Sequence, residues 1–384
     1  MATVKPLRVV VVCGVSYLGG GELALLRLLE RLPAERCQAR VVIVAASGGG
    51  LEPELWRLGL RVDVLPVVRT RHLGAGLRAL AALARIARGA DLLHANDVRA
   101  ALWCQLAALL ARRPWTWHVR DLVSGAHRFE HVARVLRPTR CIAISSAVKR
   151  ALLAFGPWEA CRVDVVLHGV DAAALAAQAD RAAFRAEMGL AEDDLAVGIV
   201  GRLIAWKGQE DFVRAAALVA PRAPNARFYV VGGIVTDPFT GQQVGDELAR
   251  LRRLASELGL NGRITFTGLR ADVASVMAGL DVLVLASHAE PFGLVLLEAM
   301  SQGTAVVATA AGGAEEVVLD GQTGLLVPPR NPPALAAALE RLLADPARVR
   351  ALGAAGRERV RTAFTLEREV DQVVQTWERA TGRR

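Results

Sequence analysis

The sequence predicts an α/β protein made of two doubly wound domains, each built on a parallel sheet, that face each other across a cleft. Three observations support this prediction. The 384 residues are too many for one ordinary domain and enough for two separate cores. Short Val- and Leu-rich runs of strand length alternate with helix-like segments. The alternation pauses near residue 171 and then starts again, as expected for two parallel sheets with helices between their strands.

The first domain begins with a strand, a glycine-rich loop and a helix. The strand is an apolar run at residues 7–13, the loop is Gly19-Gly-Gly-Glu22, and a leucine-rich helix follows to about Leu32. Later strands are separated by helical segments, and the last one ends in His168-Gly-Val-Asp171. These strands are expected at residues 40–45, 61–67, 91–94, 116–119, 141–144 and 165–171.

The second domain repeats the pattern after an alanine-rich connector. Pro238 and Gly241 mark residues 235–246 as a surface loop within it. Its strands are expected at residues 195–200, 227–231, 263–266, 281–286, 305–308 and 324–327. The first domain therefore covers residues 1–172 and the second residues 173–365.

Residues 366–384 form a separate terminal helix in this interpretation. Val370, Val373, Val374 and Trp377 recur at helical spacing, so one face of the helix is apolar. Such a helix packs on a domain that is already built.

The positive charge of the chain is concentrated in its first part. Up to residue 171 there are 24 Lys and Arg against 13 Asp and Glu, and afterwards 23 against 25. Arg69, Arg71, Arg78, Arg85 and Arg88 lie in and before a helix-like segment, an arrangement that can dock on anionic lipid. A solvated arginine-rich surface fits the same residues. Nucleic acid is not expected as a partner, because no aromatic-rich basic stretch accompanies the charge.

The sequence pattern favours a cytoplasmic protein, with the inner face of the cell membrane as a site of peripheral contact. No apolar run approaches the ~20 residues of a membrane span, and the first apolar run is not followed by a signal-peptide cleavage site. The five cysteines lack metal or C-x-x-C spacing, which fits free thiols in a reducing compartment.

Two carboxylates, Glu290 and Glu298, flank a glycine at a predicted strand-to-helix junction. Pro291 biases Glu290 away from helical geometry, whereas Glu298 falls inside the helix expected from residue 294. The N–H groups around Phe292, Gly293 and Leu294 should then form an anion-binding helix N-terminus beyond the end of a strand. An anion between two hydrogen-bonding carboxylates indicates a phosphorylated polyol, and a nucleotide sugar fits.

Two cations, Arg202 and Lys207, follow the first strand of the second domain, with Gly201 and Gly208 on either side. Arg can bind phosphate oxygens through two nitrogens and Lys acts as a compact charge, so the pair suits a diphosphate. Surface salt bridging is the other interpretation of this pair.

The first domain offers weaker signals. Gly19-Gly-Gly-Glu-Leu-Ala24 matches a loose dinucleotide-binding pattern, but the acidic residue expected about 20 positions later is missing, which disfavours a hydride-transfer enzyme. His118 ends a strand and is a candidate for a position facing the cleft. No Asp-x-Asp pair or His/Cys cluster has metal-ligand spacing, so neither a metal nor another cofactor is expected.

These motifs together resemble the retaining glycosyltransferases of family 4, whose GT-B fold consists of two Rossmann-like domains. The resemblance covers essentially the whole chain and is strongest over residues 198–328. It rests on Gly201-Arg-Leu with Lys207-Gly208, the E-x7-E from Glu290 to Glu298, Gly312-Gly313, and Gly321-x-x-Gly324-Leu-Leu-Val.

The resemblance implies roles for these residues. Arg202 and Lys207 would bind the diphosphate, Glu298 the ribose hydroxyls, and Glu290 the hydroxyls of the transferred sugar. His118 matches the acceptor-side histidine near the reacting sugar, and the terminal helix would return to the first domain. The backbone of Gly20, Gly21, Gly293, Leu294 and Val295 would complete the phosphate cradle.

Two positions depart from the family pattern. His168 stands where Asn is frequent, with little effect expected, and Ala314 replaces a larger residue, which leaves the sugar open. The implied activity is transfer of a hexosyl-type sugar from a nucleoside diphosphate to an acceptor hydroxyl, in synthesis of cell-envelope glycolipid or polysaccharide. A small-molecule acceptor such as an aminocyclitol, a sugar-nucleotide epimerase, a pyridoxal-phosphate-dependent phosphorylase and a nucleotide-sugar-binding protein without activity remain alternatives.

Overall fold

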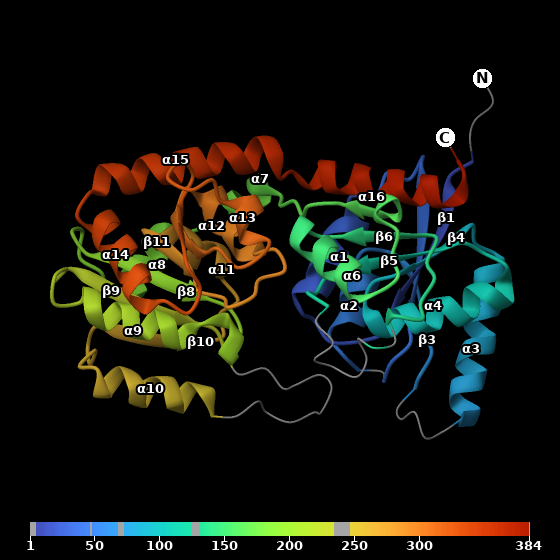
Figure 1. The fold of residues 1–384 in the computed structure, drawn as a ribbon, viewed down its shortest axis with the longest axis horizontal. Helices are drawn as coiled ribbons and strands as arrows, with labels where there is room; N and C mark the ends of the chain where they lie inside the picture. Colours follow the sequence, from blue (N-terminus) through green and yellow to red (C-terminus); the bar gives the residue numbers. More distant parts are fainter. Residues whose placement is uncertain are drawn as a thin grey trace. The chain divides into compact units, whose positions relative to one another are not determined.

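The computed structural model describes residues 5–46, 48–67, 73–123, 131, 133–233 and 246–383. The chain divides into two compact units (Figure 1). The first comprises Met1–His168 together with Leu366–Arg384, and the second comprises Gly169–Thr365. The predicted loop at residues 235–246 lies almost wholly outside the described residues, as do Arg69 and Arg71.

The first unit contains a seven-stranded parallel sheet with strand order β3-β2-β1-β4-β5-β6-β7. Its strands are β1 Leu7–Cys13, β2 Cys37–Ile43, β3 Arg61–Val64, β4 Leu92–Ala95, β5 Trp115–Val119, β6 Arg140–Ala143 and β7 Val163–Val165. Its helices are α1 Gly20–Glu30, α2 Leu51–Arg57, α3 Leu73–Arg88, α4 Val98–Ala111, α6 Ser146–Phe155 and α16 Leu366–Thr381.

The second unit contains a six-stranded parallel sheet with strand order β10-β9-β8-β11-β12-β13. Its strands are β8 Leu195–Val200, β9 Ala226–Val231, β10 Ile264–Gly268, β11 Val282–Leu285, β12 Ala305–Thr309 and β13 Leu325–Val327. Its helices are α7 Ala172–Gln178, α8 Arg181–Glu187, α9 Gln209–Val219, α10 Glu247–Glu257, α11 Val273–Gly279, α12 Leu294–Gln302, α13 Ala314–Val317, α14 Pro332–Leu343 and α15 Pro346–Ala363.

Both sheets are wound as the sequence predicts, and this confirms the fold class of two parallel-sheet α/β domains. Each sheet starts near its middle and grows outward in both directions. The strands are continuous apolar runs, such as the fully buried β11 and β12, because helices cover both of their faces. The second unit packs α9 and α14 in one apolar core against β8, β11 and β12.

The predicted strand at residues 165–171 is wrong in its position. β7 ends at Val165, and the chain then leaves the sheet. His168 turns into the interior of the first unit, where it is 3% exposed, and the unit ends at this residue. His168 donates through Nδ1 to Glu369 of α16 at 2.7 Å, so its side chain is directed to the terminal helix of the same unit.

Helix α16 completes the core of the first unit. Val370, Val373, Val374 and Trp377 are buried in one apolar cluster with residues of β1, β2 and α1. Arg36 binds Asp371 and Glu378 on the outer side of the helix at 2.6 and 3.0 Å. The first unit is therefore built from both ends of the chain. Among the described residues, no helix is both long and apolar enough to cross a membrane.

Gly208 tests the packing of the second unit. Its φ is +73°, and a Cβ atom there would lie 2.0 Å from the carbonyl oxygen of Ala286. Gly208→Ala should destabilise the protein by at least about 3 kcal/mol, because strained backbone and collision add together. Gly259→Ala is the matched control, since Gly259 has a φ of +75° and open space around it. Urea unfolding of both variants measures the difference, and equal costs would contradict the packing described here.

Candidate functional site

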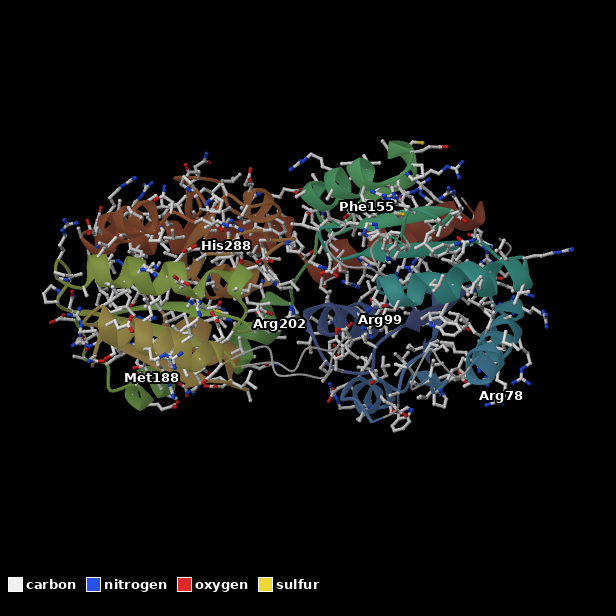
Figure 2. The ribbon with its side chains drawn as sticks, turned by 60° about the horizontal axis from the view of Figure 1, so that its bottom comes forward. Arg78, Arg99, Phe155, Met188, Arg202 and His288 are labelled. Carbon is white, nitrogen blue, oxygen red and sulfur yellow. The ribbon has the colours of Figure 1, made fainter. Side chains whose placement is uncertain are left out.

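The candidate site of the second unit lies where its sheet changes direction. The chain builds outward from β8 to β9 and β10, then crosses to β11 on the other side of β8. In doubly wound sheets, ligands bind beyond the carboxyl ends of the two strands that flank this switch point. The residues that follow β8 and β11 here include Arg202, Lys207, Glu290 and Gly293. Figure 2 labels Arg202 and His288 on these two loops.

A buried carboxylate, Glu290, is the centre of this site. It is 5% exposed, and its Oε2 atom accepts hydrogen bonds from Lys207 Nζ and from Ser287 Oγ, both at 2.7 Å. Its Oε1 atom accepts no hydrogen bond from the described part of the chain. Lys207 also lies over the ring of Trp206, with Nζ 4.3 Å from the ring centroid. One carboxylate oxygen is thus fixed and the other is available to a ligand.

Backbone contacts hold the Glu290 loop in place. The N–H of Glu290 donates to Ala311 O at 2.6 Å, and the N–H of Gly313 donates to Glu290 O at 2.8 Å. A Cβ atom on Gly313 would lie 2.3 Å from the carbonyl oxygen of Pro291, so only glycine allows this approach. The glycine pair after β12 therefore braces the loop after β11.

Helix α12 begins directly beside this carboxylate. Gly293 precedes the helix with a φ of +97°, and no side chain caps it. The backbone N–H groups of Gly293, Leu294 and Val295 donate to no described residue. Free N–H groups and the helix dipole favour an anion at this end. Glu298 lies in the next turn of the same helix and is partly exposed.

Arg202 supplies a second cation with a different environment. It is exposed after β8 and forms no ion pair with any residue that the structure describes. Lys207 is tied to Glu290, whereas Arg202 is free to bind an anion through its planar fork of donors. A guanidinium, an ammonium and a helix N-terminus thus surround one switch point, which suits a ligand with more than one phosphate.

Sequence reasoning missed three residues that shape this site. Ser287 is fully buried and supports Glu290, while His288 Nε2 lies 2.8 Å from an oxygen of Asp211 on α9. The backbone N–H of His288 also donates to Trp206 O at 2.7 Å, which joins the two loops. Ser287 directly follows the predicted strand at residues 281–286, and this position is the one signal that could have identified it.

Gly20 and Gly21 of the first unit follow β1, one of the two strands, β1 and β4, that flank its own switch point, and His118 lies in the next strand, β5. Gly20 and Gly21 open helix α1, and Gly20 is exposed with open space around its Cα. Glu22 accepts the N–H of Gly19 at 3.1 Å and is buried, and burial raises the pKa of its carboxyl group. A Cβ atom on Gly21 would lie 3.1 Å from the side chain of Arg120.

His118 belongs to a buried polar cluster around Arg120. The Arg120 guanidinium donates to Asn96 Oδ1 at 3.0 Å, to His118 Nδ1 at 3.3 Å and to His168 Nε2 at 3.4 Å. His168 in turn donates through Nδ1 to Glu369 of α16 at 2.7 Å. His118 itself is fully buried, so the structure places it beneath Arg120 rather than at the surface. His168, which stands where Asn is frequent in the family, therefore links Arg120 to α16 through its side chain as well as closing a turn.

The hydrogen bonds of this cluster fix its tautomers. Arg120 occupies His118 Nδ1 as a donor, and Trp377 donates to His94 Nδ1 at 3.1 Å, so both rings carry their proton on Nε2. Asn96 Oδ1 accepts hydrogen bonds from Arg120, so the amide nitrogen of Asn96 remains as a donor. Among the described residues, three donor groups have no hydrogen-bond partner: His94 Nε2, His118 Nε2 and Asn96 Nδ2. Buried donors without acceptors are costly, so oxygen atoms of a ligand or of solvent should complete them.

Burial keeps both histidines neutral. It lowers the pKa of His94 to about 3, and the neighbouring charge of Arg120 adds to the effect. Burial and Arg120 also hold the pKa of His118 well below its ordinary value. Neutral imidazoles can orient a ligand through hydrogen bonds, but they supply no positive charge at neutral pH.

The sequence-predicted residues therefore fall into two sets. Arg202, Lys207, Glu290, Glu298 and the amides of residues 293–295 lie around one switch point in the second unit, and Gly20, Gly21 and His118 belong to the first unit. The described residues contain no group of three or more His, Cys, Asp or Glu side chains placed to hold a metal ion.

Two doubly wound parallel-sheet units, one with a cation-rich switch point, have the architecture of GT-B glycosyltransferases. Two family models match successive parts of the chain: Glycosyltransferase Family 4 at residues 18–174, and Glycosyl transferases group 1 at residues 180–359. The chain belongs to glycosyltransferase family 4.

Several curated relatives match part of the chain. A D-inositol 3-phosphate glycosyltransferase of Rhodococcus jostii is 37% identical over 227 residues, which are 57% of this chain and 48% of that protein. The enzyme of the same name from Mycobacteroides abscessus is 41% identical over 169 residues, 44% of this chain and 36% of that protein. The chain thus spans about half the length, or less, of the curated relatives it matches.

Solved structures match over nearly the whole chain. Anabaena HepE, crystallised with UDP and glucose, has a TM-score of 0.85 and 26% identity, covering 97% of this chain and 100% of that one. A sucrose-phosphate synthase from Thermosynechococcus elongatus has a TM-score of 0.78 and 26% identity, covering 98% and 99%.

Ser287→Ala tests the support of Glu290. Ser287 donates to a buried carboxylate, and such bonds are worth about 1.5–3 kcal/mol, against about 0.5–1.5 for bonds to neutral groups. Ser301→Ala is the matched control, because Ser301 is also buried and donates to a backbone carbonyl, that of Glu298. Urea unfolding should show the larger loss for Ser287→Ala. A smaller loss than in the control would remove Ser287 from the support of Glu290.

His94 makes the stability of the first unit depend on pH. Its pKa is about 3 in the folded protein against 6.5 ordinarily, so only the unfolded chain takes up a proton as pH falls below 6.5. Stability is full above that value and declines toward pH 3, by about 2 kcal/mol between roughly pH 7 and pH 5 for this group alone. His94→Asn keeps an acceptor for Trp377 and should reduce the pH dependence of urea unfolding by that amount. The control His131→Asn removes an exposed histidine, and an unchanged pH dependence in His94→Asn would refute the assignment.

Proposed function

We propose that this chain is a glycosyltransferase that moves a hexosyl residue from a nucleoside diphosphate to an acceptor hydroxyl, with retention of configuration. The observation that supports it most is the switch point of the second unit. There a buried carboxylate with one available oxygen lies beside the uncapped N-terminus of α12 and two cations. A sugar diphosphate has hydroxyls for the carboxylate and phosphates for the rest.

The donor is bound by the second unit in this proposal. Arg202, Lys207 and the amides of residues 293–295 bind the diphosphate, and Glu298 binds the ribose hydroxyls. Glu290 binds hydroxyls of the transferred sugar through Oε1. The phosphate cradle is completed by the backbone of Gly20 and Gly21. UDP-glucose is the first donor to test, because the Anabaena structures were solved with UDP, glucose and UDP-glucose.

The chemistry depends on stabilising the leaving group. Negative charge develops on the departing diphosphate, and preorganised cations and amides at that position lower the barrier. Two hydrogen bonds from Lys207 and Ser287 hold one oxygen of Glu290, so this residue is a positioner rather than a nucleophile. A phosphate oxygen of the leaving group takes the acceptor proton, and the bond to the acceptor forms on the face that the diphosphate leaves. No metal ion or cofactor takes part.

The acceptor belongs to cell-envelope glycolipid or polysaccharide in this proposal, and the protein works in the cytoplasm at the inner face of the membrane. The net charge of +11 over residues 1–171 supports this choice. A cyclitol phosphate is the second candidate, because the curated relatives are D-inositol 3-phosphate glycosyltransferases. Arg120 and the unpaired donors around it suit an oxygen-rich acceptor of either kind. Incubating the donor without any acceptor separates an epimerase from both.

Replacing Arg202 or Lys207 with Ala tests the donor site. Each change should lower kcat/KM for UDP release at least about a hundredfold, as loss of a group that stabilises transition-state charge does. The matched control is Arg350→Ala, since Arg350 is also exposed in the second unit and forms no ion pair with described residues. Excess chelator should leave the wild-type rate unchanged. Normal turnover in both variants would overturn the assigned roles, and a rate that chelator abolishes would overturn the metal-free reaction.

A further inference from the structure

Helices α3 and α4 of the first unit present an unusual surface. They pack side by side: a Cβ atom on Gly76 of α3 would touch Trp103 of α4, and Arg113 after α4 donates to Arg88 O at the end of α3 at 2.9 Å. We define the leucine–arginine face as the exposed residues of these two helices: Leu77, Arg78, Arg85, Arg88, Leu102, Leu106, Leu109 and Leu110.

The leucines of α4 form one stripe. Leu102 lies four residues before Leu106, and Leu109 and Leu110 lie three and four residues after it, so these leucines share one side of the helix. Leu109 is 66% exposed and Leu110 is 55% exposed. The opposite side of α4 is made of small buried residues such as Ala100, Cys104 and Ala107, so the helix turns its large apolar side chains outward. Ordinary amphipathic helices do the reverse.

The arginines of α3 form a second stripe. Arg78, Arg85 and Arg88 are exposed and form no ion pair with any residue that the structure describes. Figure 2 labels Arg78 on this helix. Residues 73–120 contain two acidic residues, Asp91 and Asp97; Asp91 is paired with Arg8 and Arg383, and Asp97 caps α4. The charge of this surface is therefore uncompensated.

A hollow next to α3 offers a place for a negatively charged group. It has a volume of about 380 Å³ and is open to solvent. Arg61 and Arg85 line it, and neither is ion-paired within the described part of the chain. Arg40 lies in the same hollow and forms an ion pair with Asp63, with 2.5 Å between Arg40 Nε and Asp63 Oδ2. Asp63 also lines the hollow, and its charge acts on Arg61 as well. Three guanidinium groups therefore share one carboxylate there, and the remaining positive charge suits a phosphate group.

We propose that the leucine–arginine face docks on an anionic lipid bilayer. The leucines of α4 enter the boundary between head groups and acyl chains, and the arginines of α3 bind lipid phosphates. A second copy of the chain fits less well, because joining two such faces would bring unpaired arginines together without acidic partners. This binding is independent of turnover, so its test does not depend on the proposed reaction.

Vesicle sedimentation tests the proposal with the full chain. The protein is mixed with vesicles of phosphatidylcholine alone and with vesicles that also contain phosphatidylglycerol, and the bound fraction is measured at low and high salt. Binding should require phosphatidylglycerol and weaken with salt. Leu102→Asn/Leu106→Asn/Leu109→Asn and Arg78→Gln/Arg85→Gln should each lower the partition coefficient roughly tenfold or more.

Matched controls come from the second unit. Leu218→Asn/Leu258→Asn removes exposed leucines, and Arg341→Gln/Arg350→Gln removes exposed arginines that form no ion pair with described residues. Both should bind vesicles like the wild type. Failure of the wild type to bind phosphatidylglycerol vesicles would overturn the proposal, as would leucine variants that bind normally. Dimerisation in sedimentation velocity that the leucine variants abolish would assign the face to self-association instead.

Discussion

The second unit is organised around one buried carboxylate. Glu290 can be buried because Lys207 and Ser287 donate hydrogen bonds to one of its carboxylate oxygens. A buried charge without such partners would lower the stability of the fold. The other constraints serve this arrangement. Gly208 ends the turn that presents Lys207, and Gly313 lets the chain after β12 press against the Glu290 loop. The switch point between β8 and β11 brings these loops together, so the sheet topology and the chemistry of the site cannot be separated.

The first unit also contains a buried charged group, the guanidinium of Arg120. Arg120 donates to acceptor atoms of Asn96, His118 and His168, and the charges that act on it include those of Glu369 and Glu22. Glu369 comes from α16, as does Trp377, whose indole N–H fixes the tautomer of His94. The terminal helix is therefore part of the polar interior as well as of the apolar core. Within each unit, one charged group is stabilised by elements that are distant in the sequence.

The fold and much of the candidate site could be predicted from the sequence, and the reasons are local. Buried parallel strands are continuous apolar runs, so β8, β11 and β12 were predicted within a residue or two of their ends. Glycines next to Arg202 and Lys207, and three residues after Glu290, mark the loops that follow β8 and β11. Ser287 lies just after β11, but no sequence pattern marks its hydrogen bond to Glu290, three residues later. The cluster of Arg120 could not be predicted, because its partners lie on other strands or on α16 and no local pattern records such contacts. His168 is likewise a residue whose environment no local pattern records, because its partner Glu369 lies 201 positions later.

The composition of the first unit from both ends of the chain has a consequence for synthesis. The second unit is one continuous segment, Gly169–Thr365, and can fold as soon as it has left the ribosome. The first unit is translated earlier but lacks α16, and with it Trp377 and Glu369, until residues 366–381 emerge after the second unit. While the second unit is being synthesised, the interior histidines and Arg120 of the first unit therefore lack the contacts that α16 supplies. The first unit is thus the first to be started and the second to be completed, because it requires α16.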